Sequence, residues 1–138
     1  MQLDGSEGAA ELDRLHGLGV RGVRINLHRT SANDIAAATA RIDTTAATCA
    51  VRSWYVYLFA APSVIAQLQE TIAGLAVPMV PDHVVLLSLE DRGRADEGAM
   101  LSLFEGGIAW GKLSAPSVTS PAIIRAKMSF SLQRFHPL

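Results

Sequence analysis

The sequence predicts an α/β fold built from about four βα units with parallel strands. Two observations predict it. Stripes of apolar residues at helical spacing alternate along the chain with short runs rich in β-branched and aromatic residues. The strand-like runs begin near Val20, Ser53, Val77 and Ile108, which leaves room for a crossover helix between each pair.

The composition indicates one folded domain. The chain has 138 residues, of which 49% are hydrophobic and 18% charged, enough apolar material for a single core. Its formal net charge is -1 and its basic residues are scattered, so we expect no nucleic-acid partner. Cys49 is the only cysteine, which fits a reducing compartment. An acidic N-terminus and short apolar runs predict a cytoplasmic protein without a membrane segment.

The first predicted helix and strand occupy residues 6–27. Apolar residues recur at helical spacing between Ser6, which suits an N-cap, and Gly19, which suits a helix end. The strand that follows alternates, so its two faces differ. The apolar face holds Val23, Ile25 and Leu27, and the polar face holds Gly22, Arg24 and Asn26.

A second helix and a second strand come next. Ser31 and Asp34 resemble a capping box ahead of an apolar stripe, which predicts a helix over residues 30–43. Residues 53–60 are dense in aromatic and β-branched side chains and predict a strand. Its two faces hold Trp54, Val56 and Leu58 on one side and Tyr55, Tyr57 and Phe59 on the other.

The remaining elements repeat the order. Pro62 suits a first helical turn, and the apolar stripe after it predicts a third helix ending near Gly74. Residues 77–81 predict a short strand, residues 96–107 a helix, and residues 108–114 a fourth strand. The stripe of the third helix consists of Ile65, Leu68, Ile72 and Leu75.

Two architectures satisfy this alternation. One is an open doubly wound sheet, with helices on both faces. The other is a set of consecutive units of a (β/α)8 barrel, which needs roughly 250 residues when complete. Periodicity alone does not choose between them.

Four segments carry motifs that are specific in combination. They are LHGLGVRGVRINL, WYVYLFA, VPMVPDHVVLL and IAWGKLSAP. In order, they hold a G-x-R-G-x-R-x-N strand, an aromatic strand, an aspartate and histidine pair at a strand end, and a W-x-K-x-S strand. Together they resemble successive strand regions of the amidohydrolase superfamily, in its 2-pyrone-4,6-dicarboxylate hydrolase-like branch. The resemblance covers residues 8–116.

The resemblance implies part of a (β/α)8 TIM barrel that hydrolyses a small carboxylated lactone, ester or amide. Complete members of the family can use a divalent ion such as zinc or manganese. The family's His-x-His strand and its water-activating aspartate have no match here, so we expect a truncated form. We expect residues 1–116 to form the partial barrel domain and residues 117–138 an unrecognised, loosely packed tail.

The sequence departs from the family pattern at several positions. Tyr55 and Tyr57 stand where the resemblance leads us to expect histidine and glutamine. Val84 and Val85 follow the aspartate and histidine pair where a glycine is normal, and Ser117 stands where the family continues with tyrosine.

Asp82 and His83 end an apolar strand, where parallel-sheet proteins expose functional groups. The resemblance gives His83 the catalytic role of helping to bind the reacting carbonyl or a metal. The alternative is structural, with Asp82 capping the loop through backbone N–H groups and His83 a satisfied core histidine.

The resemblance assigns substrate binding to the polar face of the strands. Arg24 would hold a substrate carboxylate, because its planar fork binds carboxylates through two hydrogen bonds, and Asn26 shares its face. The alternative for Arg24 is a side chain whose stem packs on the sheet and whose head pairs with a carboxylate. Tyr55 and Tyr57 would line the same interior, where a phenol can donate to an anion; as an alternative, they are simply core residues.

Lys112 and Ser114 end the fourth predicted strand on the same candidate face, although a lysine there is commonly only solvated. His16 and His28 have no recognisable metal spacing with His83, so we expect no metal site made by this chain alone.

A second hypothesis is a noncatalytic α/β module that forms a homo-oligomer or joins a complementing chain. Four βα units do not close an eight-stranded barrel, and an open parallel sheet leaves strand edges and apolar surface uncovered. A small carboxylated molecule is the ligand expected under the first hypothesis.

Overall fold

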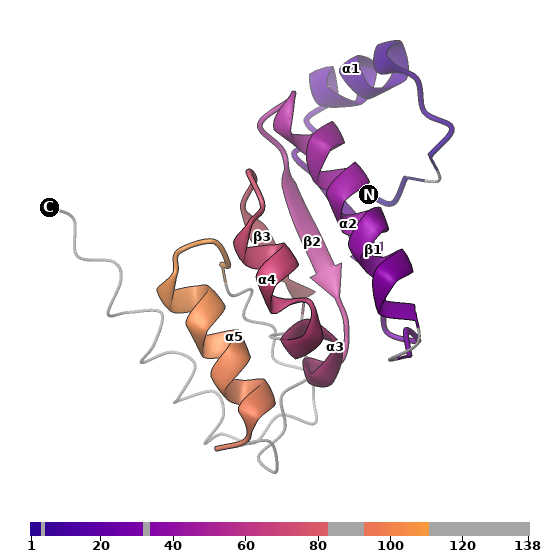
Figure 1. Ribbon diagram of the computed structural model, residues 1–138. Helices are drawn as coiled ribbons and strands as arrows, with labels where there is room; N and C mark the ends of the chain where they lie inside the picture. The colour runs from indigo at the N-terminus through magenta and orange to yellow at the C-terminus, as the bar shows by residue number, and fades with distance from the viewer. Residues whose placement is uncertain (4, 32–33, 83–92, 111–138) are drawn as a thin grey trace, which may run out of the picture.

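A computed structural model describes residues 1–3, 5–31, 34–82 and 93–110 (Figure 1). Helices and strands alternate along these residues. In chain order they are α1 (Ala9–Gly17), β1 (Gly22–Asn26), α2 (Ile35–Ala50), β2 (Tyr55–Phe59), α3 (Pro62–Gln67), α4 (Gln69–Ala73), β3 (Met79–Pro81) and α5 (Ala95–Glu105).

The three strands form one parallel sheet in the order β1, β2, β3. The spatial order equals the chain order, as in consecutive βα units. Ala109 forms a parallel bridge with Met79 on the far side of β3, at the place where the sequence predicts a fourth strand. The rest of that predicted strand, from residue 111, lies outside the described residues.

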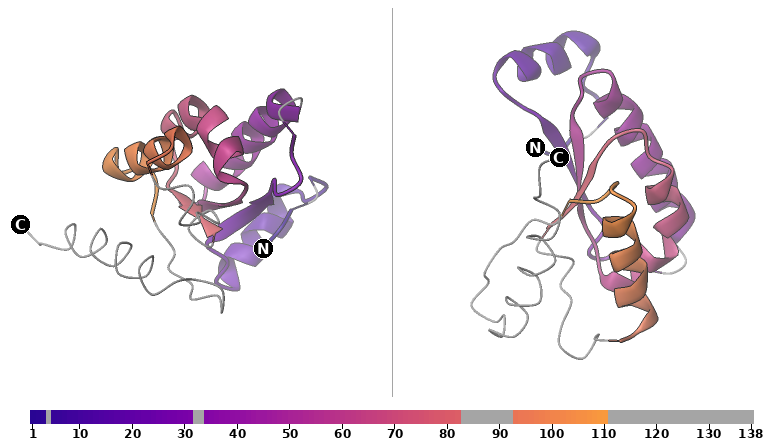
Figure 2. Two further views of the ribbon diagram at one scale, coloured as in Figure 1. Left: turned by 90° about the horizontal axis from the view of Figure 1, so that it is seen from below. Right: turned by 90° about the vertical axis from the view of Figure 1, so that its left-hand side faces the viewer.

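The side on which the helices lie separates the two predicted architectures. Helices α2 to α5 all lie on one side of the sheet (Figure 2). A doubly wound sheet would carry helices on both faces, whereas the units of a barrel carry them on the outer face alone. Among the described residues, the arrangement is therefore that of consecutive barrel-like units.

The core lies between this helical layer and the apolar face of the strands. The predicted alternation is observed, because Val23, Ile25, Val56 and Leu58 are at most 2% exposed. Each such side chain contributes about 1.5–3 kcal/mol when fully buried. The helices complete the core with Ala38, Ile42, Ala46 and Cys49 from α2, Val64, Ile65 and Ile72 from α3 and α4, and Met100 and Leu103 from α5.

Two predicted helices differ from the observed ones at their boundaries. The first starts at Ala9 with Gly8, not Ser6, at the N-cap, and it ends before Gly19, whose φ of +93° favours glycine. The second extends to Ala50, beyond the predicted end at residue 43. The predicted capping box was wrong: Ser31 Oγ and Ser31 N donate to Asp34 Oδ2 at 2.6 and 3.3 Å, but Asp34 is itself the N-cap and no side chain caps the helix.

The third predicted helix is two short helices. α3 and α4 meet at Leu68, whose φ of -96° and ψ of 5° interrupt the regular helix. The apolar stripe crosses the break intact, because Ile65, Leu68 and Ile72 are all fully buried. Periodicity therefore identified the buried face correctly but not the change of direction.

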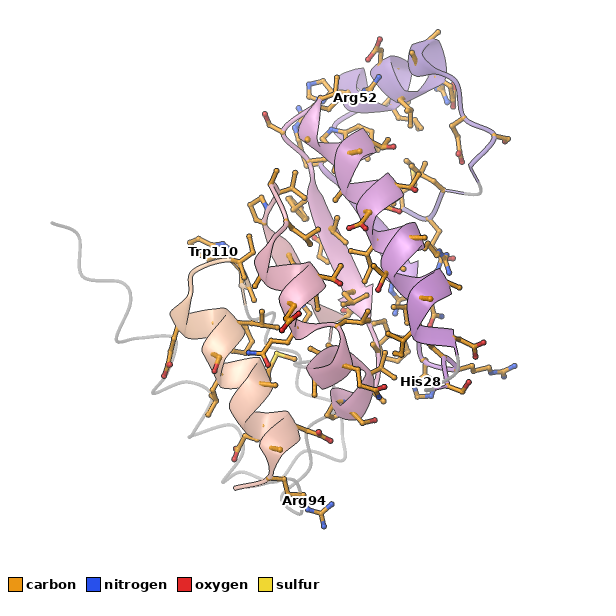
Figure 3. All side chains as sticks on the ribbon, viewed as in Figure 1. His28, Arg52, Arg94 and Trp110 are labelled. Carbon is orange, nitrogen blue, oxygen red and sulfur yellow. The ribbon has the colours of Figure 1, made fainter. Side chains whose placement is uncertain are left out.

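α1 is attached to the start of β2 through a cluster of four side chains. Trp54 Nε1 donates to His16 Nδ1 at 2.9 Å, and the two rings lie nearly parallel. Arg52 lies over the Trp54 ring and pairs with Asp13 of α1 at 2.8 Å. This cluster, which we call the α1 clasp, lies at the end of the sheet where the strands begin, as the position of Arg52 in Figure 3 shows.

Cys49 is fully buried in the core. Burial raises the pKa of its thiol to about 11, so the thiol stays protonated at neutral pH. Within the described residues, no helix is both long and apolar enough to cross a lipid bilayer.

Candidate polar site on the open face of the sheet

The face of the sheet opposite the helices carries the polar and aromatic side chains of the strands. Strand register places Gly22 beside Tyr55, Arg24 beside Tyr57, and Asn26 beside Phe59. The sequence predicted that these six residues share a face, and the register places them together on it. The face thus combines one cation, one amide and three aromatic rings.

Arg24 lies at the centre of this face and reaches across β2. Its Nη2 lies 2.9 Å from Asp82 Oδ2, at the end of β3. On the way, its guanidinium carbon lies 5.0 Å from the centroid of the Phe59 ring. This contact matches the structural alternative for Arg24, in which the head of the arginine pairs with a carboxylate of the protein. Asp82 is therefore an ion-pair partner of Arg24, a contact between strands that sequence reasoning did not identify.

Part of the hydrogen-bonding capacity of Arg24 is unused. Its side chain is 35% exposed, but Nε is buried and has no hydrogen-bond partner. A buried donor without a partner costs about 1–3 kcal/mol. The Nη2 of Arg24 lies against Asp82, and a guanidinium can also hold a carboxylate through two parallel hydrogen bonds.

The two tyrosines form a hydrogen-bonded pair beside Arg24. Tyr57 Oη donates to Tyr55 Oη at 3.1 Å, and the rings meet edge to face. The hydrogen bond with Tyr55, together with burial, raises the pKa of Tyr57 to about 12. The Tyr57 phenol therefore keeps its proton at neutral pH.

Gly22 is required by the position of Tyr55. A Cβ on Gly22 would lie 2.7 Å from Tyr55 Cε2 and 2.9 Å from the Tyr55 carbonyl oxygen. No side chain fits there without movement of the sheet, so the glycine of the G-x-R-G-x-R-x-N pattern has a steric explanation.

His28 extends the polar face past the end of β1. Its ring stacks on Phe59 with 5.0 Å between centroids, and its backbone N–H donates to Asn26 Oδ1 at 3.0 Å. Figure 3 shows His28 at the end of the sheet opposite Arg52. Sequence reasoning considered His28 only as a metal ligand and missed this position, although it has the parity of Arg24 and Asn26.

The other predicted site residues, His83, Lys112 and Ser114, lie outside the described residues, as does the predicted tail at 117–138. Within the described ranges, no three His, Cys, Asp or Glu side chains are placed to hold a metal ion. The described residues therefore do not supply a ligand set for the divalent ion that the resemblance implies.

Comparison with solved structures finds a protein with a similar fold. The chain is similar to a protein from Acinetobacter baumannii that is described as a probable 2-pyrone-4,6-dicarboxylic acid hydrolase and was solved with citric acid bound. The TM-score is 0.69 and the identity 24%, over 97% of this chain and 52% of that one. No family model and no curated protein matches the chain. The chain thus spans about half the length of this neighbour and shares the α/β fold of a hydrolase-like protein.

Proposed function

We propose that the open face of the sheet binds a small carboxylated molecule, as part of a hydrolase of the amidohydrolase type acting on a lactone, ester or amide. The observation that carries the proposal is Arg24, a cation at the centre of a polar face with a buried Nε that has no partner. Arginine suits a carboxylate because its N–H groups match the two carboxylate oxygens.

Two further features support a carboxylated ligand. Tyr55 and Tyr57 place phenol groups beside Arg24, and phenols can donate to an anion. The solved neighbour carries citric acid, a polycarboxylic acid. Its description as a probable hydrolase supports a hydrolase-like function for a protein that shares the fold.

In the proposed reaction, water adds to the carbonyl carbon of the substrate, the acyl C–O or C–N bond breaks, and the leaving oxygen or nitrogen takes up a proton from that water. The protein stabilises the charge that develops on the carbonyl oxygen. We assign that polarising role to His83, and substrate contacts to Arg24, Asn26, Tyr55, Tyr57, Lys112 and Ser114. A cytoplasmic location, expected from the single cysteine, belongs to the same proposal.

Binding is tested by titrating the chain with citrate in a calorimeter at low ionic strength. We expect Arg24→Ala to weaken citrate binding about tenfold or more, and Arg24→Lys to weaken it less, because lysine keeps the charge but not the fork. Arg14→Ala is the matched control, since Arg14 also pairs with a carboxylate but lies on α1. Equal affinity of the Arg24→Ala variant and the parent chain would disprove the proposed site.

Catalysis is tested by a screen of lactones and amides with and without added zinc or manganese. If turnover is found, His83→Ala should reduce kcat about a hundredfold, in line with the loss of one group that stabilises the transition state. An unchanged rate would remove His83 from the mechanism.

A second candidate function is a noncatalytic module that associates with a second copy of the chain. The one-sided layer of α2 to α5 favours it, because none of these four helices covers the opposite face of the sheet (Figure 2). Trp110, in the segment of residues 108–110 that pairs with the far side of β3, is 59% exposed. A second copy packed against this side of the sheet would cover it.

A further inference from the structure

The end of β3 holds a carboxylate that the proposed function does not use. Among the residues that the structure describes, Asp82 is the one buried polar or charged residue, with 6% of its surface exposed. A charge in such a place is costly unless it is paired. Its partner Arg24 comes from β1, so the ion pair passes over β2 and joins the two outer strands of the sheet.

We propose that Asp82 is a positioning residue, which holds the Arg24 guanidinium in place over Phe59 so that its exposed N–H groups face a bound carboxylate. This inference rests on the proposed function, in which Arg24 receives the ligand. It concerns the orientation of that arginine, not its charge.

Two contacts fix the guanidinium. Its carbon lies 5.0 Å from the centroid of the Phe59 ring, and its Nη2 lies 2.9 Å from Asp82 Oδ2. Two contacts from different parts of the sheet limit the positions that the group can take. An arginine side chain loses rotamer entropy when it is ordered. If Asp82 and Phe59 order this side chain before the ligand binds, binding does not include that entropy cost, and the affinity is higher.

The Arg24 side chain remains partly exposed beside the ion pair. Its Nη2 lies against Asp82, and the 35% exposure of the side chain gives a ligand access to the group. Asp82 could have the opposite role, in which its carboxylate occupies the position of the ligand and competes with it for Arg24. The two roles predict opposite effects of removing the aspartate, so one titration decides between them.

The experiment compares Asp82→Ala and Asp82→Asn in the same citrate titration. The asparagine oxygen still accepts a hydrogen bond from Arg24, so we expect Asp82→Asn to keep the parent affinity within about threefold. Alanine leaves the guanidinium without this contact, so we expect Asp82→Ala to weaken binding about tenfold. Tighter binding by both variants would show a competitor and overturn the proposal, and so would an unchanged affinity in Asp82→Ala.

Phe59→Leu provides a second test, which does not depend on how well Asp82→Ala folds. It removes the ring under the guanidinium and keeps Asp82, so weaker citrate binding is expected and an unchanged affinity would count against the proposal. Asp13→Ala is the matched control for the aspartate variants, because it breaks another Arg–Asp pair at the opposite end of the sheet.

If Arg24→Ala abolishes binding while the Asp82 and Phe59 variants bind normally, only the positioning role fails. If Arg24→Ala binds normally, the proposed function fails as well.

Discussion

At the scale of single residues, Gly22 shows how the sheet limits substitution. A methyl group there would meet both the ring and the backbone of Tyr55 at less than 3 Å. We expect Gly22→Ala to destabilise the chain by about 1–3 kcal/mol, because the neighbouring strand has to move. Urea unfolding measures this change. Gly98→Ala in α5 is the control: nothing lies near its Cβ, so it should stabilise the helix by about 0.5–1 kcal/mol. Equal effects of the two substitutions would contradict the steric explanation.

Tyr57 allows a prediction at alkaline pH. Its pKa is raised to about 12 in the folded chain, from an ordinary value of 10.0, chiefly by the hydrogen bond with Tyr55. The folded state therefore binds this proton more tightly than the unfolded state, so the stabilisation is complete below pH 10.0 and is lost as the pH rises towards about 12. The chain has two tyrosines, and Tyr55→Phe leaves Tyr57 as the only one. Ultraviolet titration of this variant should find a pKa closer to 10.0; a value that stays near 12 would assign the shift to burial instead.

The sequence predicted which residues share the polar face but not how they pair. Strand parity places Arg24, Tyr55 and Tyr57 together, because alternate side chains point to the same side. The contact between Arg24 and Asp82 joins residues that are 58 positions apart in sequence. It depends on the order of the strands in the sheet. Parity along one strand contains no information about that order.

At the scale of elements, the α1 clasp makes the first helix depend on one hydrogen bond to a buried ring. Trp54 is fully buried, and its indole N–H donates to His16. His16→Leu would leave this buried donor without its acceptor, so we expect a loss of about 1–3 kcal/mol in the free energy of unfolding, measured with urea. Arg14→Ala, on the same helix, removes only a solvent-exposed ion pair and should leave stability unchanged. If His16→Leu had the same free energy of unfolding as the parent chain, α1 would be held by its apolar side chains alone.

Helices were predicted from apolar spacing, and this explains both the successes and the errors. Spacing identifies the buried stripe, which is why Ile42, Ile65 and Ile72 lie in the core as expected. It does not specify where hydrogen bonding stops. The predicted N-cap at Ser6 was wrong for this reason, and so was the single helix after Pro62, which breaks at Leu68.

At the scale of the whole molecule, the alternation of elements predicted the parallel sheet but left its curvature open. An open doubly wound sheet and a partial barrel share the same order of strands and helices. They differ in whether successive helices lie on the same side, which depends on the packing of the complete chain. The structure places α2 to α5 on one side (Figure 2).

Self-association is the prediction that belongs to this scale. If a second copy covers the segment beside β3, sedimentation should give a mass of two chains, and Trp110→Lys should shift the equilibrium towards one chain. Val51→Lys is the matched control, because Val51 is another exposed apolar residue, at the end of α2 and 80% exposed. A single-chain mass at high concentration would exclude this module, and an effect of both lysine variants would indicate nonspecific adhesion.

The two tryptophans have opposite environments and occupy different parts of the sheet. Trp54 is fully buried at the start of β2, whereas Trp110 is 59% exposed beside β3. Their fluorescence should therefore separate into a component that acrylamide quenches weakly and one that it quenches strongly. The chain thus carries two intrinsic optical probes, one that responds to release of α1 and one that responds to whatever covers the segment beside β3.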